Sequence, residues 1–339
     1  MAKSTKVLDT SSALLTELVP ANLDILYNWD YGTKNPALRV LYDKGQRAQW
    51  IPEVAIDWSR QVDPCAENLP DDQSAIAVSK RLQRMTKRQR GELRRHMLAW
   101  TLSQFMHGEQ GALIVTSSMV MCVPDIDAKY YGATQVMDEA RHMFVYYKYL
   151  SEKLELVYPI APELKTLLDE TVRKKNWDER FLGMQIVVEG LALSAFKFIQ
   201  GATKDREPLL HDVTRYVQQD EARHVAFGVT ALRDYYKELS EGEIHQRVEF
   251  LAEACALIRE RLIPVQVWDE LGFPKSEIAE LVRQSDQRRQ FQNLLFSTVV
   301  PNIKKLGLLN PELRKAFDKM GVLEYESWPS TVDMPEDNI

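Results

Sequence analysis

The pentapeptide Asp-Glu-Ala-Arg-His occurs twice in this chain, at positions 138–142 and again at positions 220–224. Each copy holds a glutamate and a histidine at the same spacing, Glu139 with His142 and Glu221 with His224. Residues with this i, i+3 spacing lie on one face of an α-helix, so each copy directs one carboxylate and one imidazole toward the same point. Carboxylate and imidazole are ligands that suit iron and manganese. The repeat therefore predicts a metal site to which both copies contribute.

A site built on two helices needs further ligands from their neighbours. In an antiparallel bundle, the partner carboxylate stands at the same height on the adjacent helix, so the connecting loop falls at the sequence midpoint. The midpoint between Glu109 and Glu139 is Pro124, in "CVPDID". The midpoint between Glu189 and Glu221 is Asp205, in "GATKDREP". Both midpoints carry loop residues, which predicts two helical hairpins.

Glu109 and Glu189 also share apolar surroundings, for example "QIVVEGLALSAF" around the second. A carboxylate buried there without a partner is costly, and a bound cation removes that cost. The offset from Glu109 to Glu189 is almost the same as the offset from Glu139 to Glu221, which indicates an internal duplication with pseudo-twofold symmetry. The predicted metal ligands are Glu109, Glu139, His142, Glu189, Glu221 and His224.

Three regions would position these ligands. Residues 1–75 are rich in proline and tryptophan and predict an irregular extension that wraps the core. In residues 76–305, apolar residues recur every three or four positions between breakers, with no convincing strand alternation. Long helices with short connections predict an all-α fold, an antiparallel four-helix bundle with additional helices. Residues 306–339 predict a C-terminal helix followed by an acidic tail.

Composition restricts the classes of function. The net charge of −6 supplies no basic field for nucleic acid. No apolar run approaches the roughly 18–20 residues of a membrane span, and the N-terminus lacks the apolar core of a signal peptide. The three cysteines stand far apart and form no CxxC pair, so we expect a reducing, cytoplasmic setting without a zinc or iron–sulfur site.

With all six ligand positions matched over about residues 80–240, the chain resembles the carboxylate-bridged di-iron oxygenase superfamily of ferritin-like fold. That superfamily includes the methane and toluene monooxygenase hydroxylases, the ribonucleotide reductase small subunit and the ligand-binding oxidases similar to it. The stretch "LYDKGQRAQWIPEVAIDWSR" at 41–60 also looks like the segment before the bundle in the last group. The resemblance implies two iron ions, or a manganese–iron pair, with O₂ as co-substrate.

The resemblance also implies partners for the ligand histidines. A metal-bound histidine usually donates its other ring nitrogen to a carboxylate, and an aspartate precedes each ligand glutamate of the repeat. In the monooxygenase hydroxylases, similar aspartates bond to the histidine of the opposite motif. The residues expected in these roles are Asp138 near His224, Asp220 near His142, and Arg141 and Arg223 balancing the charge beside them.

Residues one helical turn from the ligands are candidates to line a substrate pocket, although plain core packing explains many of them equally well. The candidates are Phe105, Met106, Leu113, Gln185, Leu193, Phe196 and Phe227. Tyr146, one turn after His142, resembles the radical tyrosine of the ribonucleotide reductase small subunit; a core aromatic residue is the alternative.

Three departures separate the chain from particular relatives. The hydroxylases carry a threonine where this chain has Leu193, and the arylamine N-oxygenases carry an additional histidine where it has Val217. The tyrosine–valine crosslink of the ligand-binding oxidases is absent, because its two positions hold Met184 and Gly111.

These observations predict an O₂-activating di-iron oxygenase acting on a small organic substrate. The alternatives are a radical-generating component similar to the ribonucleotide reductase small subunit or a ligand-binding oxidase, with Tyr146 storing the oxidising equivalent, and an iron-storage or peroxide-scavenging protein. Because the chain has no GxGxxG motif and no cysteine cluster, we expect electrons from a separate reductase or ferredoxin, or from the substrate itself. We also expect a homodimer, as is common among relatives.

Overall fold

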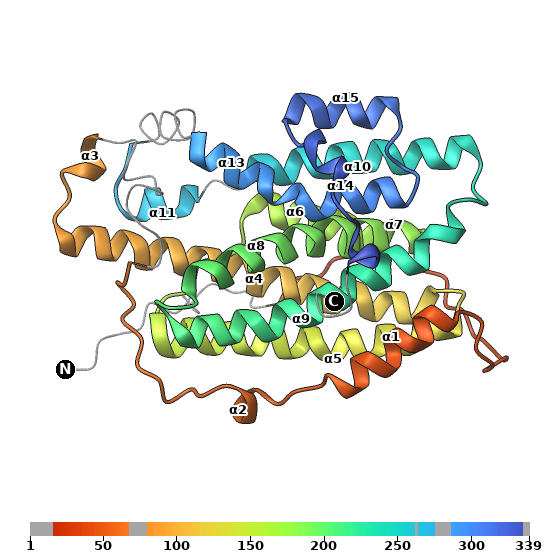
Figure 1. Ribbon diagram of the computed structural model, residues 1–339, viewed down its shortest axis with the longest axis horizontal. Helices are drawn as coiled ribbons and strands as arrows, with labels where there is room; N and C mark the ends of the chain where they lie inside the picture. The colour runs from red at the N-terminus through yellow and green to blue at the C-terminus, as the bar shows by residue number, and fades with distance from the viewer. Residues whose placement is uncertain (1–15, 68–79, 262–263, 275–285, 335–339) are drawn as a thin grey trace.

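A computed structural model describes residues 16–67, 80–261, 264–274 and 286–334. All the regular elements defined in these ranges are helical, which confirms the predicted all-α class (Figure 1). The α-helices are α1 Pro36–Arg47, α2 Pro52–Ala55, α3 Lys80–Gln83, α4 Lys87–Cys122, α5 Ile126–Tyr149, α6 Pro162–Arg173, α7 Trp177–Phe181, α8 Glu189–Thr203, α9 Pro208–Tyr235, α10 Glu241–Arg261, α11 Val265–Glu270, α13 Asp286–Leu294, α14 Phe296–Lys305 and α15 Pro311–Met320. Two π-helical segments, η3 Leu150–Leu154 and η4 Leu182–Val188, and two 3₁₀ turns, η5 Leu323–Ser327 and η6 Thr331–Asp333, complete the set.

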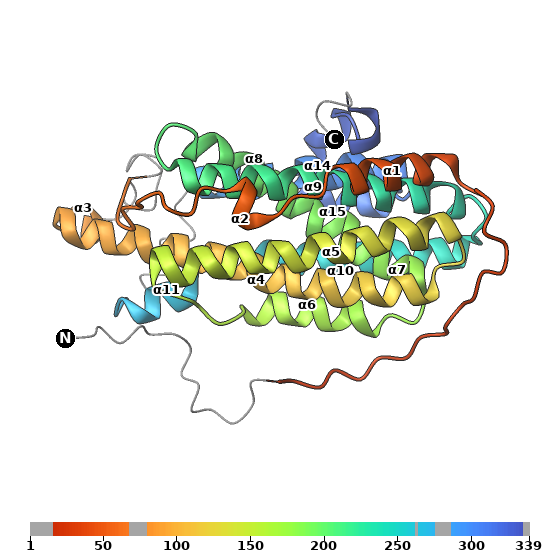
Figure 2. The ribbon, with the colours of Figure 1, turned by 90° about the horizontal axis from the view of Figure 1, so that it is seen from below.

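Two helical hairpins form the centre of the molecule. Helices α4 and α5 are joined by the short turn at 123–125, and α8 and α9 by the turn at 204–207. Both turns contain the predicted midpoints, Pro124 and Asp205, so the hairpin prediction is confirmed. In Figures 1 and 2, α4, α5, α8 and α9 run side by side along the long axis of the molecule. This packing brings the middle of α4, α5 and α9 to the same height as the start of α8.

Side-chain caps explain where these long helices begin. Thr86 and Gln89 form a reciprocal capping box at the start of α4, which satisfies backbone N–H groups that have no partner inside the helix. The side chain of Asp125 caps α5, and Glu207 caps α9 immediately before Pro208. Local side-chain caps therefore fix the starts of α4, α5 and α9.

Within the described residues 16–67, the helices α1 and α2 lie in the region predicted as an irregular extension. Apolar residues on one face of α1 are buried, and α1 packs against α5 and α9. Downstream, Trp50 and Trp58 pack against the core, whereas Trp29 is 77% exposed and stacks on Tyr27 of its own segment. The predicted division after residue 75 lies outside the described residues and stays a prediction.

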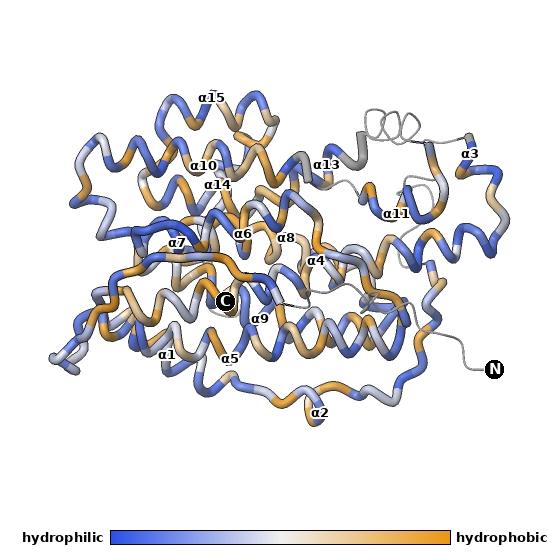
Figure 3. The backbone as a smooth tube through the Cα atoms, turned by 180° about the vertical axis from the view of Figure 1, so that it is seen from behind, coloured by the Kyte–Doolittle hydropathy of each residue, from blue (hydrophilic) through white to orange (hydrophobic). Residues whose placement is uncertain are grey.

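The C-terminal part adds an outer layer over α8. Helix α14 lies so close to α8 that a Cβ on Gly190 would come within 3.1 Å of Val299. Hydrophobic and hydrophilic residues alternate along α15 and α10 in Figure 3, as expected of helices with one face on the core. Helix α15 and the turns η5 and η6 follow the predicted order of helix and tail, and residues 335–339 lie outside the described range.

The continuous helix Trp177–Thr203, made of α7, η4 and α8, is 27 residues long. By length and composition this helix could cross a membrane, whereas the sequence analysis expected no apolar run of that length. However, 72% of its most apolar window is buried inside the protein, as in the central helix of a helical core.

Candidate metal centre

The structure brings all six predicted ligands together in the middle of the bundle. Helix α4 supplies one glutamate, α8 begins with another, and α5 and α9 each supply a Glu-x-x-His pair. Every one of these side chains is buried, with at most 5% exposure. Their possible ligand atoms form two groups whose members lie within 4.8 Å of one another: Glu109, Glu139, His142 and Glu221 in the first group, and Glu139, Glu189 and His224 in the second.

The two imidazoles turn the same nitrogen toward the centre. His142 Nδ1 lies 3.4 Å from Glu109 Oε2 and 3.2 Å from Glu221 Oε1. His224 Nδ1 lies 3.1 Å from Glu139 Oε1 and 3.5 Å from Glu221 Oε1. Glu139 also faces His142 through its other oxygen, at 3.5 Å. Glu139 and Glu221 are therefore placed between the two imidazoles, where each carboxylate could bridge two ions.

The atoms that converge on this point are buried and lack hydrogen-bond partners. They are Glu139 Oε2, Glu189 Oε2, both carboxylate oxygens of Glu221, His142 Nδ1 and His224 Nδ1. Buried polar atoms are normally hydrogen-bonded, and leaving one unsatisfied costs about 1–3 kcal/mol. Hard oxygen ligands with imidazole fit iron or manganese, and four carboxylates can neutralise two divalent ions. The residues thus fit a dimetal cofactor.

Burial and the neighbouring charges shift the pKa values of the ligand carboxylates in different directions. Burial raises the pKa of both Glu109 and Glu189 well above the ordinary value, and the nearby charge of Glu221 adds to the effect. Burial acts in the same direction on Glu139, but the imidazoles of His224 and His142 outweigh it and lower its pKa. The ligand set therefore retains protons that a metal ion must displace.

Both imidazole pKa values are raised. Burial alone would lower them, but the surrounding carboxylates outweigh it: Asp220 and Glu109 contribute most for His142, and Glu139 and Glu221 for His224.

The outer nitrogens of the histidines contact the aspartates in the crossed arrangement that the resemblance implied. His142 Nε2 lies 3.1 Å from Asp220 Oδ2, and His224 Nε2 lies 3.2 Å from Asp138 Oδ2. A carboxylate at this nitrogen favours the tautomer with its proton on Nε2, which leaves the Nδ1 lone pair directed at the centre. Arg141 and Arg223 each form an ion pair with the aspartate one turn earlier on the same helix.

Sequence reasoning missed two residues that support these aspartates. Trp50 Nε1 donates to Asp220 Oδ2 at 2.7 Å, and Gln49 Nε2 donates to Asp138 Oδ1 at 2.8 Å. Arg141 donates to the carbonyl oxygen of Trp50 at 2.7 Å, which holds the segment after α1 in place. The only signal in the sequence was that Gln49 and Trp50 lie within the stretch 41–60 that looks like the segment before the bundle in relatives.

Replacing Asp220 with asparagine is expected to weaken metal binding by about 10–100-fold, because His142 loses its charged acceptor. Competition with a coloured chelator under anaerobic conditions measures this affinity. Asp234→Asn is the matched control, since Asp234 lies on the same helix with its side chain 65% exposed. Equal affinities for the Asp220→Asn and control proteins would contradict this role.

A cavity of about 210 Å³ borders the cluster. Glu109, Glu189 and Glu221 form part of its wall. The remaining lining is mainly apolar and comes from α4, α6, α8, α10, α13 and the segments beside them: Met97, Trp100, Thr101, Gln104, Phe105, Gly108, Ala112, Leu164, Val188, Leu191, Ala192, Ala195, Ile258, Pro264, Phe291 and Leu295. Such a lining suits a small, largely apolar molecule.

Of the seven predicted pocket residues, only Phe105 lines this cavity. The other six, Met106, Leu113, Gln185, Leu193, Phe196 and Phe227, are not part of its wall, and their role as pocket residues stays a prediction. A position one turn from a ligand lies near the ligand's face of the helix, but the side of the cluster on which a cavity opens depends on how the neighbouring helices pack. Leu193, for example, packs with Ala222 and Val225, and Phe227 packs against Tyr131 and Phe181.

Tyr146 is fully buried, and its hydroxyl has no hydrogen-bond partner. Burial raises its pKa well above the ordinary value, and the nearby charge of Glu109 adds to this. Its ring packs against Phe105, at 5.8 Å between ring centroids. The phenol is therefore neutral and close to the cluster.

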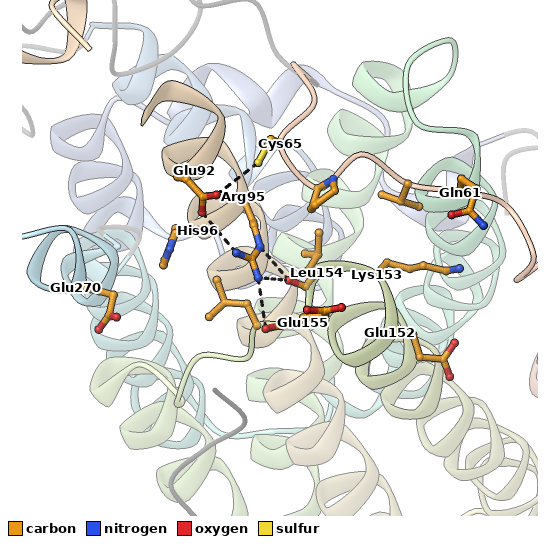
Figure 4. A pocket seen from close by; sticks show the side chains of 13 residues that line it. Gln61, Cys65, Glu92, Arg95, His96, Glu152, Lys153, Leu154, Glu155 and Glu270 are labelled. Atoms are coloured by element: carbon orange, nitrogen blue, oxygen red, sulfur yellow. Dashed lines mark hydrogen bonds and ion pairs between the residues drawn. The ribbon is translucent and has the colours of Figure 1, made fainter. Parts of the chain in front are cut away.

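A larger surface cavity of about 810 Å³ lies elsewhere and contains none of the six ligands (Figure 4). Its central cation, Arg95, donates to the carbonyl oxygen of Leu154 at 2.9 and 2.7 Å and pairs with Glu92 at 3.4 Å. Lys153 donates to two backbone carbonyl groups of the N-terminal segment. Arg95 and Lys153 therefore connect α4, the segment around Leu154 and the N-terminal segment through these hydrogen bonds.

Two antiparallel hairpins around two Glu-x-x-His pairs and two further glutamates define a ferritin-like carboxylate dimetal protein. Residues 33–307 match the family model described as p-aminobenzoate N-oxygenase AurF. Because this match spans most of the chain, the protein belongs to the AurF family.

Solved structures show the same fold. An R2-like ligand-binding oxidase with an aerobically reconstituted metal cofactor, studied after photoconversion, is 18% identical with a TM-score of 0.53, over 80% of this chain and 93% of that one. A variant of that oxidase with an aerobically reconstituted Mn/Fe cofactor is 18% identical with a TM-score of 0.51, over 84% and 93%. No curated protein matches the sequence.

Family membership and the buried cluster together identify the chain as an O₂-activating di-iron oxidoreductase. This confirms the predicted class of enzyme and its kind of cofactor.

Proposed function

We propose that the protein oxygenates a small, largely apolar organic substrate held in the 210 Å³ cavity beside two iron ions. The observation that carries this proposal is the position of Glu109, Glu189 and Glu221. They belong to the metal cluster and at the same time form one wall of an otherwise apolar cavity. A substrate there would lie directly against the oxidising centre, with little water between them.

In this proposal the six clustered residues are the metal ligands. Glu109 and His142 hold one ion, Glu189 and His224 hold the other, and Glu139 and Glu221 lie between them. Two bound ferrous ions would supply a place for O₂ to bind and electrons for its reduction. A manganese–iron pair remains the alternative composition, because the same ligand types accept either metal.

The other residues of the site have supporting roles. Asp138 and Asp220 keep a proton on the outer nitrogen of each ligand histidine, so that its inner nitrogen is the one that gives up its proton and binds an ion. Arg141 and Arg223 neutralise these two aspartates. The apolar side chains of the cavity exclude water from the oxidant.

An amine nitrogen is the first substrate atom to test, because the family model is named for p-aminobenzoate N-oxygenation. Val217, which stands at the sequence position expected for the additional histidine, is fully buried and offers no ligand atom. Carbon hydroxylation therefore remains the competing reaction. Product analysis with a panel of anilines, aminobenzoates and their deaminated analogues separates the two reactions.

Filling the cavity tests the proposal directly. Ala192→Phe, on α8 within the cavity wall, is expected to lower kcat/KM by about 100-fold, because it fills the space proposed for the substrate without removing a ligand. Metal content should stay unchanged. Val54→Phe adds a similar ring at a site that is 81% exposed and serves as the control. Normal turnover by Ala192→Phe would show that the substrate binds elsewhere.

A radical-generating role is the second candidate, favoured by the buried and unpartnered hydroxyl of Tyr146. In this role the centre would oxidise Tyr146 rather than an organic substrate. Electron paramagnetic resonance after O₂ is added to the ferrous protein decides between them. A stable tyrosyl signal that disappears in Tyr146→Phe would support the radical role.

We also propose that electrons come from a separate reductase or ferredoxin. Neither a dinucleotide-binding motif nor a cysteine cluster occurs in the sequence, so the chain offers no second redox site of these kinds. Multiple turnovers with substrate and O₂ alone, without any donor, would refute this proposal.

A homodimer is proposed on the basis of an apolar stripe along α5. The stripe consists of exposed residues spaced alternately by four and three positions, which places them on one helix face: Ala133, Met137, Ala140, Phe144 and Tyr147. Met137 is 64% and Phe144 is 45% exposed in the single chain. Pairing with the same stripe of a second copy would bury both.

Phe144→Glu is expected to convert this dimer to a monomer, because it places two charges in the apolar contact. Light scattering coupled to size-exclusion chromatography measures the mass. Val265→Glu, at a position 41% exposed on α11, is the control. A wild-type monomer, or a dimer that survives Phe144→Glu, would contradict the proposal.

A further inference from the structure

Gln135 lies one helical turn before Glu139 on α5 and is fully buried. Its Nε2 donates to Glu139 Oε1 at 2.9 Å and to Glu189 Oε1 at 2.8 Å. A side-chain amide carries two N–H donors, and both are used here on carboxylates of the second ligand group. Gln135 thus links a glutamate of α5 to a glutamate of α8.

The orientation of Gln135 is supported from behind by Gln185. Gln185 Nε2 lies 3.5 Å from Gln135 Oε1 and 3.4 Å from Thr116 Oγ1. Gln185 belongs to the π-helical segment η4 directly before Glu189, and segments of this kind are frequent at functional sites. A Cβ on Gly228 would lie 2.5 Å from Gln185 Cβ, so α9 packs directly on this side chain. The amide donors of Gln135 are therefore aimed at the carboxylates.

The other half of the duplication has no such amides. The offset that relates Glu139 to Glu221 places Val217 at the position equivalent to Gln135, and the offset that relates Glu109 to Glu189 makes Phe105 the equivalent of Gln185. Val217 is fully buried, and Phe105 lines the cavity. Amide donors at these positions therefore support only the side of the centre that holds Glu189, while the opposite side faces apolar groups.

We propose that Gln135 is a positioning residue that holds Glu139 and Glu189 for the metal ion beside His224, and thereby makes the two metal positions unequal. The inference rests on the dimetal centre of the proposed function. Hydrogen bonds to ligating carboxylates fix their orientation, and losing such a bond costs about 10–100-fold in metal affinity. The affinity for the ion held by Glu189 and His224 should fall most, because both hydrogen bonds of the Gln135 amide go to carboxylates of that ion's ligand group.

Gln135→Met tests this inference, since methionine keeps the length of the side chain and removes both donors. Anaerobic titration of the full-length protein with Mn(II) against a competing chelator measures two successive affinities. We expect the weaker affinity to fall by about 10–100-fold and the stronger one to stay within about threefold of wild type. After desalting, anomalous scattering from crystals should locate the remaining ion beside Glu109 and His142.

Two further variants keep the test decisive. Gln185→Met removes the amide that supports Gln135 and leaves the contacts of Gln135 with the carboxylates in place. If Gln135→Met does not fold, Gln185→Met should still weaken the binding of the same ion. Val217→Ala alters the pseudo-equivalent position and should leave both affinities unchanged. An equal loss of affinity for both ions, or no change in either affinity, would overturn the inference. A wild-type protein that binds fewer than two ions would overturn the dimetal centre itself.

Discussion

The Glu139→Ala protein is expected to lose both metal ions and to turn over at least about 1000-fold more slowly than wild type. Glu139 is the residue common to the two ligand groups, with one oxygen facing each histidine. Removing it takes a ligand from both ions at once. A loss of several kcal/mol of transition-state stabilisation corresponds to a rate loss of this size.

Metal analysis after anaerobic reconstitution and desalting measures the first effect, and a substrate assay measures the second. Glu189→Ala provides a graded comparison, because Glu189 belongs to one ligand group only and its loss should leave about one ion bound. Glu249→Ala, with its side chain 57% exposed, is the control for removing a carboxylate. Circular dichroism confirms that each variant is folded. Two firmly bound ions in the Glu139→Ala protein would refute the bridging position.

Divalent metal is expected to raise the melting temperature of the protein on the order of 10 °C, and by more at pH 8 than at pH 6. The pKa values of Glu109 and Glu189 are raised in the folded, metal-free protein, as are those of His142 and His224. A group with a raised folded pKa stabilises the fold at low pH, and this stability is lost as the pH rises through that pKa.

The metal-free protein should therefore become less stable as the pH rises, while the metal-bound protein has already lost these protons. The rise in melting temperature caused by metal consequently becomes larger as the pH increases. Anaerobic melting curves with and without Mn(II) measure this difference, and calorimetry in two buffers of different ionisation enthalpy counts the protons released. Glu109→Gln should reduce the difference between the metal stabilisation at pH 6 and that at pH 8. A stabilisation that shrinks between pH 6 and pH 8, with no proton release, would contradict this account.

The six clustered side chains could be predicted because their placement depends on short-range regularities. An i, i+3 spacing puts Glu139 and His142 on one helix face whatever surrounds them. A helical hairpin with a turn at Pro124 then sets Glu109 at the matching height, since rise per residue is constant along a helix. The duplication repeats both arguments in the second half of the chain. Helix period, turn residues and the cost of a buried carboxylate were sufficient.

The surroundings of the cluster depend on contacts that no local pattern records. Trp50 reaches Asp220 across 170 positions of the sequence, and Gln135 reaches Glu189 across 54. The cavity walls likewise depend on how each helix is rotated against its neighbours, which is why Phe105 faces the cavity while Phe196 and Phe227 do not. Periodicity tells which residues of one helix share a face, but which helices that face meets, and where a cavity is left between them, follows from close packing, which only the folded chain determines.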